Sequence, residues 1–323
     1  MNLEIIPLQQ ISQDITFQTD QTDLIRAFLR GRNQKTIEAY RQDLTDFADF
    51  LEAGSIDEAA KILLSRGPGQ ANLLALRYKT SLIDRGLQAA TVNRRLAALR
   101  SLVKLARTLG MTLYTLQVEN MKSQPYRDTR GPGREGYRAM LDQAGKQKDH
   151  KAIRDTAILH LLYDLGLRRG EVVSLQVIDL DLSTGTLMIL GKGRTQKETL
   201  TLPNETKKAL ADWLEIRQSI MENRVDPGYL FINFDPAKSA EGLTGDGLYK
   251  IVRALGDKAG IKARPHGLRH SAITQALDLT QGNIRAVAKF SRHRNIQVLT
   301  CYDDNRQDLG GGVAAMVAAG AFL

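Results

Sequence analysis

A cluster of imidazole and guanidinium side chains gives the sequence its clearest chemical signal. In PHGLRHS, His266, Arg269 and His270 stand at positions i, i+3 and i+4, so on a helix they share one end. A metal site would need further ligands, and the only cysteine, Cys301, lies far off along the chain. Histidine beside arginine is suited instead to holding a phosphate, because a guanidinium donates two parallel hydrogen bonds.

Four further residues extend this pattern. Arg168 lies in LGLRRGEVVSL just after a predicted helix, and Lys192 lies in the glycine-flanked turn GKG. His293 stands between two arginines in SRHRN, and Tyr302 follows it by nine residues. Taken singly, each signal is weak: an arginine at a helix end is most often a surface residue, and a GKG turn without the rest of a Walker A loop is common.

The charge of the chain favours a polyanionic partner. Across 323 residues the formal net charge is +9 and the pI is about 9.6, and neutralising phosphates releases counterions, which drives binding. Many basic proteins bind no nucleic acid, so charge alone leaves both readings open. The single cysteine excludes an intrachain disulfide. The sequence shows no apolar run long enough for a bilayer and no signal peptide, so we expect a cytoplasmic protein without a membrane partner.

Helical periodicity and turn signals divide the chain into five segments. They are a polar extension (1–20), a compact domain of four helices (21–115), a basic linker rich in glycine and arginine (116–136), a second domain (137–309) and a tail (310–323). Within the second domain, the β-rich runs 186–190 and 198–202 flank the GKG turn and predict a hairpin. We therefore expect a mainly α protein, with an all-helical N-terminal domain and a mixed α/β domain that is mostly helical around a small antiparallel sheet.

One predicted helix, residues 91–109, has the charge pattern of a DNA-contacting element. Its cations form or flank one stripe beside an apolar stripe, and the helix holds no acidic residue; they are Arg94, Arg95, Arg100, Lys104 and Arg107. A merely solvated face ordinarily mixes charges of both signs along the helix. The pattern favours contact with DNA phosphates over a solvated face.

The ordered set of chemical residues resembles the tyrosine recombinases of the phage integrase family. That family carries arginine in a GLR-x-x-E segment, lysine on a hairpin turn, His-x-x-Arg, a second histidine, and a nucleophilic tyrosine nine residues later. The matching positions here are Arg168, Lys192, His266, Arg269, His293 and Tyr302. The likeness also covers the N-terminal half, where KTIEAYRQDLTDFADFL and the basic helix resemble the family's core-binding domain. With about 20 residues before the first helix, the chain resembles the simple, Xer-like recombinases.

The resemblance implies a mechanism without metal, ATP or another cofactor. Arg168 and Arg269 would clamp the phosphate and stabilise the pentacoordinate transition state, while Tyr302 attacks phosphorus to give a 3′-phosphotyrosyl link. His266 is the candidate base, and Lys192 would protonate the leaving 5′ oxygen. His293 would donate a hydrogen bond to the phosphate. A second exchange would pass through a Holliday junction, for integration, excision or dimer resolution.

Two departures from the family pattern concern the same site. The family has Leu-Gly-His before the tyrosine, whereas this chain has Ser291-Arg292-His293. The hairpin turn is also about two residues longer than the family's, which makes Lys197 a rival of Lys192 as general acid.

The resemblance implies double-stranded DNA as substrate, a homotetramer on two recombination sites, and association with the nucleoid. Two alternatives remain open: a DNA-binding relative with weak or no catalysis, and a type IB topoisomerase-like or telomere-resolving enzyme. For the tail, Gly310–Gly312 predict a hinge before an uncharged, alanine-rich segment. We expect this segment to pack on its own domain or to stay loose in the monomer, and to dock on a neighbouring protomer on DNA.

Overall fold

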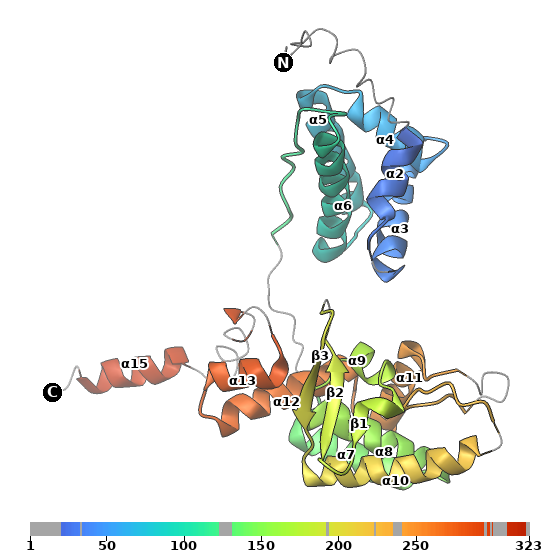
Figure 1. Ribbon diagram of the computed structural model, residues 1–323. Coiled ribbons are helices and arrows are strands. Elements are labelled where there is room, and N and C mark those ends of the chain that lie inside the picture. Colours follow the sequence, from blue (N-terminus) through green and yellow to red (C-terminus); the bar gives the residue numbers. More distant parts are fainter. Residues whose placement is uncertain are drawn as a thin grey trace, which may run out of the picture. The chain divides into compact units, whose positions relative to one another are not determined.

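A computed structural model describes most of the chain in two compact units, residues 1–125 and 126–323 (Figure 1). The described residues are 21–32, 34–122, 131–191, 194–222, 224–234, 241–293, 296–297, 299 and 309–320. Lys192 and Tyr302 lie outside them, as do residues 1–20 and residues 123–130 of the predicted linker. Each unit is mainly helical, and the only sheet among the described residues belongs to the second.

The described part of the first unit consists of helices. They are α2 (Gln21–Leu29), α3 (Gln34–Phe50), α4 (Ile56–Leu64), α5 (Pro68–Asp84) and α6 (Ala89–Thr108). Four of them were expected, whereas the short helix α4 was not. Its N-terminus is capped by Ser55, whose hydroxyl accepts the Glu58 amide at 3.1 Å. The glycines that follow α5 and α6, Gly86 and Gly110, both have positive φ, which suits a helix C-terminus.

Helix α6 is the most enclosed helix of this unit. It packs against α2, α3 and α5 (Figure 1), and its apolar stripe is fully buried at Val92, Leu96, Leu99 and Val103. Phe28, Phe47 and Tyr78 fill the space between the other helices. The predicted apolar stripe beside the basic one is therefore confirmed, because it faces the core.

The second unit is mainly helical and carries one small antiparallel sheet. The helices are α7 (Gly133–Gly145), α8 (His150–Tyr163), α9 (Arg169–Val173), α10 (Asn204–Met221), α11 (Gly245–Lys258), α12 (Pro265–Leu279), α13 (Ile284–Ser291) and α15 (Leu309–Gly320), with a 3-10 turn at Val177–Asp179. The strands are β1 (Leu180–Asp181), β2 (Thr186–Leu190) and β3 (Lys197–Thr201). The expected hairpin is present as β2 and β3, in a register that pairs Leu190 with Lys197, and β1 adds a short third strand.

Helix α8 forms the centre of this unit. It packs against α7, α10 and α12 (Figure 1), and Leu159, Leu161 and Leu162 are fully buried on it. From the sheet, Leu187 and Ile189 point into the same core, while Met188 and Leu190 on the opposite face are exposed. This core fixes the C-terminal end of α8, where the chain turns toward Arg168.

The tail differs from the expectation. Gly310–Gly312 lie inside helix α15, so the prediction of a glycine hinge there is wrong. Met316 and Val317 are 75% and 67% exposed. Among the described residues, no helix combines the length and apolar character needed to cross a bilayer.

Candidate active site

The turn between α8 and α9 presents Arg168. Gly166 has φ +55°, and a side chain there would meet the Phe290 ring at 3.3 Å, so glycine is needed for both reasons. Arg168 begins α9: its amide donates to Glu171 Oε2 at 2.8 Å, and its Nη1 donates to Glu171 Oε1 at 2.7 Å. The Arg168 side chain remains 27% exposed, whereas Glu171 is buried. A buried carboxylate thus holds an arginine that still reaches the surface.

Arg269 on α12 is held at the centre of the site. It is 1% exposed. Its Nη1 donates to the Gly166 carbonyl and its Nη2 to the Ser291 carbonyl. One guanidinium therefore joins the turn that carries Arg168 to the end of α13, which precedes His293. The expectation that Arg168, Arg269 and His293 come together from distant segments agrees with these contacts.

The histidines of the site are neutral near pH 7. Burial and the charges of Arg269 and Arg168 lower the pKa of His266. Burial and the same arginines lower the pKa of His293 to about 4. His270, whose ring packs edge-on against that of His266 with 4.3 Å between centroids, also has its pKa lowered to about 4, chiefly by burial. A neutral imidazole can accept a proton, which is what a general base must do.

The hydrogen bonds of Ser291 define the tautomer of His293. The Ser291 hydroxyl donates to the Val287 carbonyl at 2.7 Å and lies 2.8 Å from His293 Nδ1. Because the hydroxyl proton is already used, His293 Nδ1 must carry the hydrogen that this second contact needs. A neutral His293 then has an unprotonated Nε2. Donation from Nε2 to a phosphate would require the phosphate to raise the pKa of this histidine.

The rival lysines are distinguished by a buried carboxylate. Lys197, on β3, forms an ion pair with Asp179, which is 3% exposed. An ammonium group held by a buried carboxylate is poorly placed to protonate a leaving group. This argues against Lys197 as general acid. Lys192 and the predicted nucleophile Tyr302 lie outside the described residues, so their roles stay predictions.

Comparisons with known proteins agree with this geometry. The profile of the phage integrase family matches residues 134–308, and that of its N-terminal SAM-like domain matches residues 26–109. A tyrosine recombinase of Synechococcus elongatus is 41% identical over 296 residues, which cover 90% of this chain and 91% of the relative. One from Synechocystis is 38% identical over 291 residues, covering 88% and 91%. The crystal structure of the XerH recombinase bound to a palindromic difH substrate is similar in fold, with a TM-score of 0.66, 19% identity, and coverage of 92% of this chain and 85% of that one.

The chain belongs to the tyrosine recombinase (phage integrase) family. Its family match over residues 134–308 contains every predicted catalytic position, from Arg168 to Tyr302. The reaction of a tyrosine recombinase calls for groups that clamp the phosphate and for a general base. Two residues that the sequence analysis left without a role stand out beside them: Glu171, which holds Arg168, and Arg292. Glu171 could have been found, since a glutamate three residues after a helix start is a capping signal.

The basic helix of the recombinase is only partly available to DNA. Arg94 donates to Asp43 at 2.6 Å. Arg95, 11% exposed, forms ion pairs with Asp43 and Asp46. Both aspartates come from α3, so they supply the opposite charge that α6 itself lacks. Arg95 faces the neighbouring helix, which corrects the expectation that it contacts DNA.

The other cations of α6 lie nearer to solvent. Arg100 donates to the Val118 carbonyl at 2.7 Å and to Asn120 at 2.8 Å, which ties α6 to the segment that follows it. Lys104 and Arg107 are exposed. The proposed DNA contacts are therefore concentrated at the C-terminal half of this helix.

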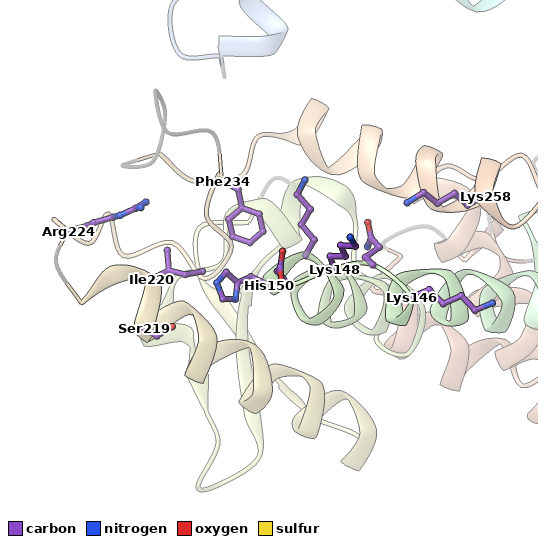
Figure 2. Close-up of a pocket in the computed structure, with 11 residues that line it drawn as sticks. Lys146, Lys148, His150, Ser219, Ile220, Arg224, Phe234 and Lys258 are labelled. Atoms are coloured by element: carbon purple, nitrogen blue, oxygen red, sulfur yellow. The ribbon is translucent and has the colours of Figure 1, made fainter.

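A basic hollow elsewhere in the second unit has a structural explanation. It measures about 910 Å³ and is lined by residues that include Lys146, Lys148, His150, Arg224 and Lys258 (Figure 2). Three of these cations stand at helix C-terminal ends: Lys146 after α7, Arg224 just beyond α10, and Lys258 as the last residue of α11. Positive charge stabilises such ends. None of the predicted catalytic residues lines this hollow.

Proposed function

We propose that this protein cleaves and rejoins DNA at specific sites through a 3′-phosphotyrosyl intermediate formed by Tyr302. The observation that supports this most strongly is the placement of Arg269 between the Gly166 and Ser291 carbonyls. It brings two predicted phosphate-binding groups, Arg168 and His293, to one buried arginine. Such preorganised donors stabilise charge that develops in a transition state.

The proposed step balances as follows. The Tyr302 oxygen attacks phosphorus, and its proton passes to neutral His266. The bond from phosphorus to the 5′ oxygen breaks, and that oxygen takes a proton from Lys192. Arg168 and Arg269 hold the non-bridging oxygens throughout. Religation reverses the step with the 5′ hydroxyl of another strand, and a second round would resolve a Holliday junction. The phosphotyrosyl bond conserves the bond energy, so the reaction needs no metal, ATP or other cofactor.

The assembly we propose is a homotetramer on two double-stranded DNA sites, in the compartment that holds the chromosome. In it, α15 of one protomer would dock on its neighbour, since Met316 and Val317 are exposed in the single chain. Deleting residues 313–323 should spare binding of one half-site and impair cooperative assembly. Equal recombination of two full sites by the truncated and intact proteins would contradict the exchange.

A nicked suicide substrate tests the catalytic proposal. Cleavage beside the nick releases a short fragment and traps the protein on DNA as an adduct that survives boiling in detergent. The Tyr302→Phe variant should bind the site with unchanged Kd and form no adduct, because binding depends on many phosphate contacts. Adduct formation by that variant would place the nucleophile elsewhere, with Tyr249 the next tyrosine to replace.

A further inference from the structure

Arg292 has a backbone conformation that side chains rarely adopt. It follows the last residue of α13 with φ +57° and ψ +35°, the left-handed region. A residue with a Cβ adopts this region only at an energetic cost. The Arg292 side chain is nevertheless 5% exposed. A strained residue of this kind persists only where its surroundings hold it.

Five contacts hold the Arg292 guanidinium, and they come from three parts of the second unit. Nη1 donates to the Phe290 carbonyl at 2.9 Å and to the Leu165 carbonyl at 3.2 Å. Nη2 donates to the Gly166 carbonyl at 3.1 Å and to Glu171 Oε2 at 3.3 Å. Nε faces Glu198 Oε1 at 3.5 Å, and within the described part of the chain neither of these two buried atoms has a hydrogen-bond partner.

Each of these parts leads to a residue of the proposed reaction. Leu165 and Gly166 form the turn before Arg168. Glu198 belongs to β3, the strand that leaves the hairpin turn carrying Lys192. Arg292 itself directly precedes His293. We propose that Arg292 is a positioning residue that locks the Arg168 turn, the lysine hairpin and the His293 segment into one arrangement, a role that rests on the function proposed above.

The lock also has an electrostatic part, because Arg292 and Arg168 share Glu171. Burial alone would raise the pKa of Glu171, but the Arg168 amide and the Arg292 charge outweigh it, and the net pKa lies below its ordinary value. A buried carboxylate with a single cation would hold that cation tightly. Because Arg292 is a permanent second partner, Glu171 can release the Arg168 guanidinium to a phosphate without becoming an unpaired buried charge.

The test compares variants that separate the side chain from the backbone. Arg292→Gly suits φ +57° and removes all five contacts, Arg292→Ala keeps the backbone strain, and Arg292→Lys keeps a charge with fewer donors. Arg285→Ala, an exposed arginine of the same helix, is the matched control. Half-site Kd and the rate of adduct formation at saturating DNA are measured for each protein, with hydrogen exchange of peptides covering residues 165–171, 194–201 and 59–106.

The glycine and alanine variants should form the adduct at least tenfold more slowly than the wild type, with a half-site Kd changed less than twofold and the lysine variant intermediate. Exchange should rise in residues 165–171 and 194–201 and stay unchanged in 59–106. Adding Glu198→Gln to Arg292→Gly should recover part of the rate, because it removes a carboxylate that has lost one of its two cations, Arg194 being the other. A wild-type rate for Arg292→Gly, or a loss that only follows a rise in exchange along the whole chain, would overturn the proposal. Failure of the wild type itself to form an adduct would reject the proposed function, while the exchange measurement still tests the lock.

Discussion

Two clusters of arginine, one in each unit, differ in the partners that neutralise them. In the first unit, Arg94 and Arg95 pair with the carboxylates Asp43 and Asp46. In the second, Arg269 donates to two backbone carbonyls, while Arg168 and Arg292 share one carboxylate, that of Glu171. A carboxylate cancels a guanidinium charge, whereas a carbonyl carries only a partial charge and leaves most of it in place. The first arrangement joins helices, and the second keeps a positive field for a phosphate.

The pKa directions express the same difference. Burial alone would raise the pKa of Asp46, but hydrogen bonds from Arg85 and Tyr78 outweigh it, and the net pKa lies below its ordinary value. In the second unit, after burial, the charge of Arg269 contributes to the lowered pKa of all three histidines near it, His266, His270 and His293.

The largest expected effect is loss of the Arg269 guanidinium from the second cluster. Arg269→Ala should slow adduct formation about 10²- to 10³-fold, by analogy with the loss of one oxyanion-hole donor. The reason is that the phosphate loses a hydrogen-bond donor, and so do the carbonyls of Gly166 and Ser291. Single-turnover rates at saturating DNA measure this on protein shown by circular dichroism to be folded. A rate near that of the wild type would make Arg269 a structural arginine like Arg95.

The matched change in the first unit should act on stability instead. Breaking a buried ion pair costs about 3–5 kcal/mol, and for Arg95→Ala we expect roughly 2–4 kcal/mol because Arg94 and Arg85 still pair with Asp43 and Asp46. Urea unfolding should show this loss in the free energy of unfolding. The adduct rate of the folded protein should stay within about twofold. A large loss of rate with unchanged stability would show that Arg95 reaches DNA after all.

Local patterns encode where the predicted active-site arginines lie on the fold, and their catalytic roles stay predictions. Arg168 follows a helix-ending glycine, and the i, i+3 spacing of His266 and Arg269 places both at the start of α12. The partners of Arg95 are 49 and 52 residues away on another helix, so no local pattern could reveal that it is buried. The buried role of Arg292 depends on contacts up to 127 residues distant, and the sequence showed only that it is unusual. The glycines of the tail were misjudged because low helix propensity weakens a helix without forbidding it.

A pH titration tests the contrast between the two arginine clusters, and we expect an effect of intermediate size. The pKa of His293 is lowered to about 4 in the folded protein, against an ordinary value of 6.5. Between these values the unfolded chain binds the proton and the folded chain does not, so stability rises with pH and is lost as pH falls from 6.5 toward 4. His293→Asn should reduce this loss by about 1–2 kcal/mol between pH 7 and 4.5.

The control for this titration is His150→Asn, at the exposed start of α8, which should leave the profile unchanged. The readout is the difference in free energy of unfolding from the wild type at each pH. Parallel profiles for the wild type and His293→Asn would mean that neither burial nor the charge of Arg269 lowers the pKa of this histidine.

The smallest effect concerns the cations of α6 that pair with no carboxylate in the described part of the chain. If Lys104 and Arg107 each contact one phosphate, replacing both with alanine should reduce the slope of log Kd against log salt by about 1.8, since each contact contributes about 0.9. Arg95→Ala should leave the slope unchanged, because its charge is already cancelled by Asp43 and Asp46. The Arg95→Ala variant has lost one positive charge and the double variant two, but we predict a much larger difference between them in salt dependence than in net charge. Equal slopes for the wild type and the two variants would mean that exposure on this face does not decide DNA contact. The comparison between the two arginine clusters would then hold only for the second unit.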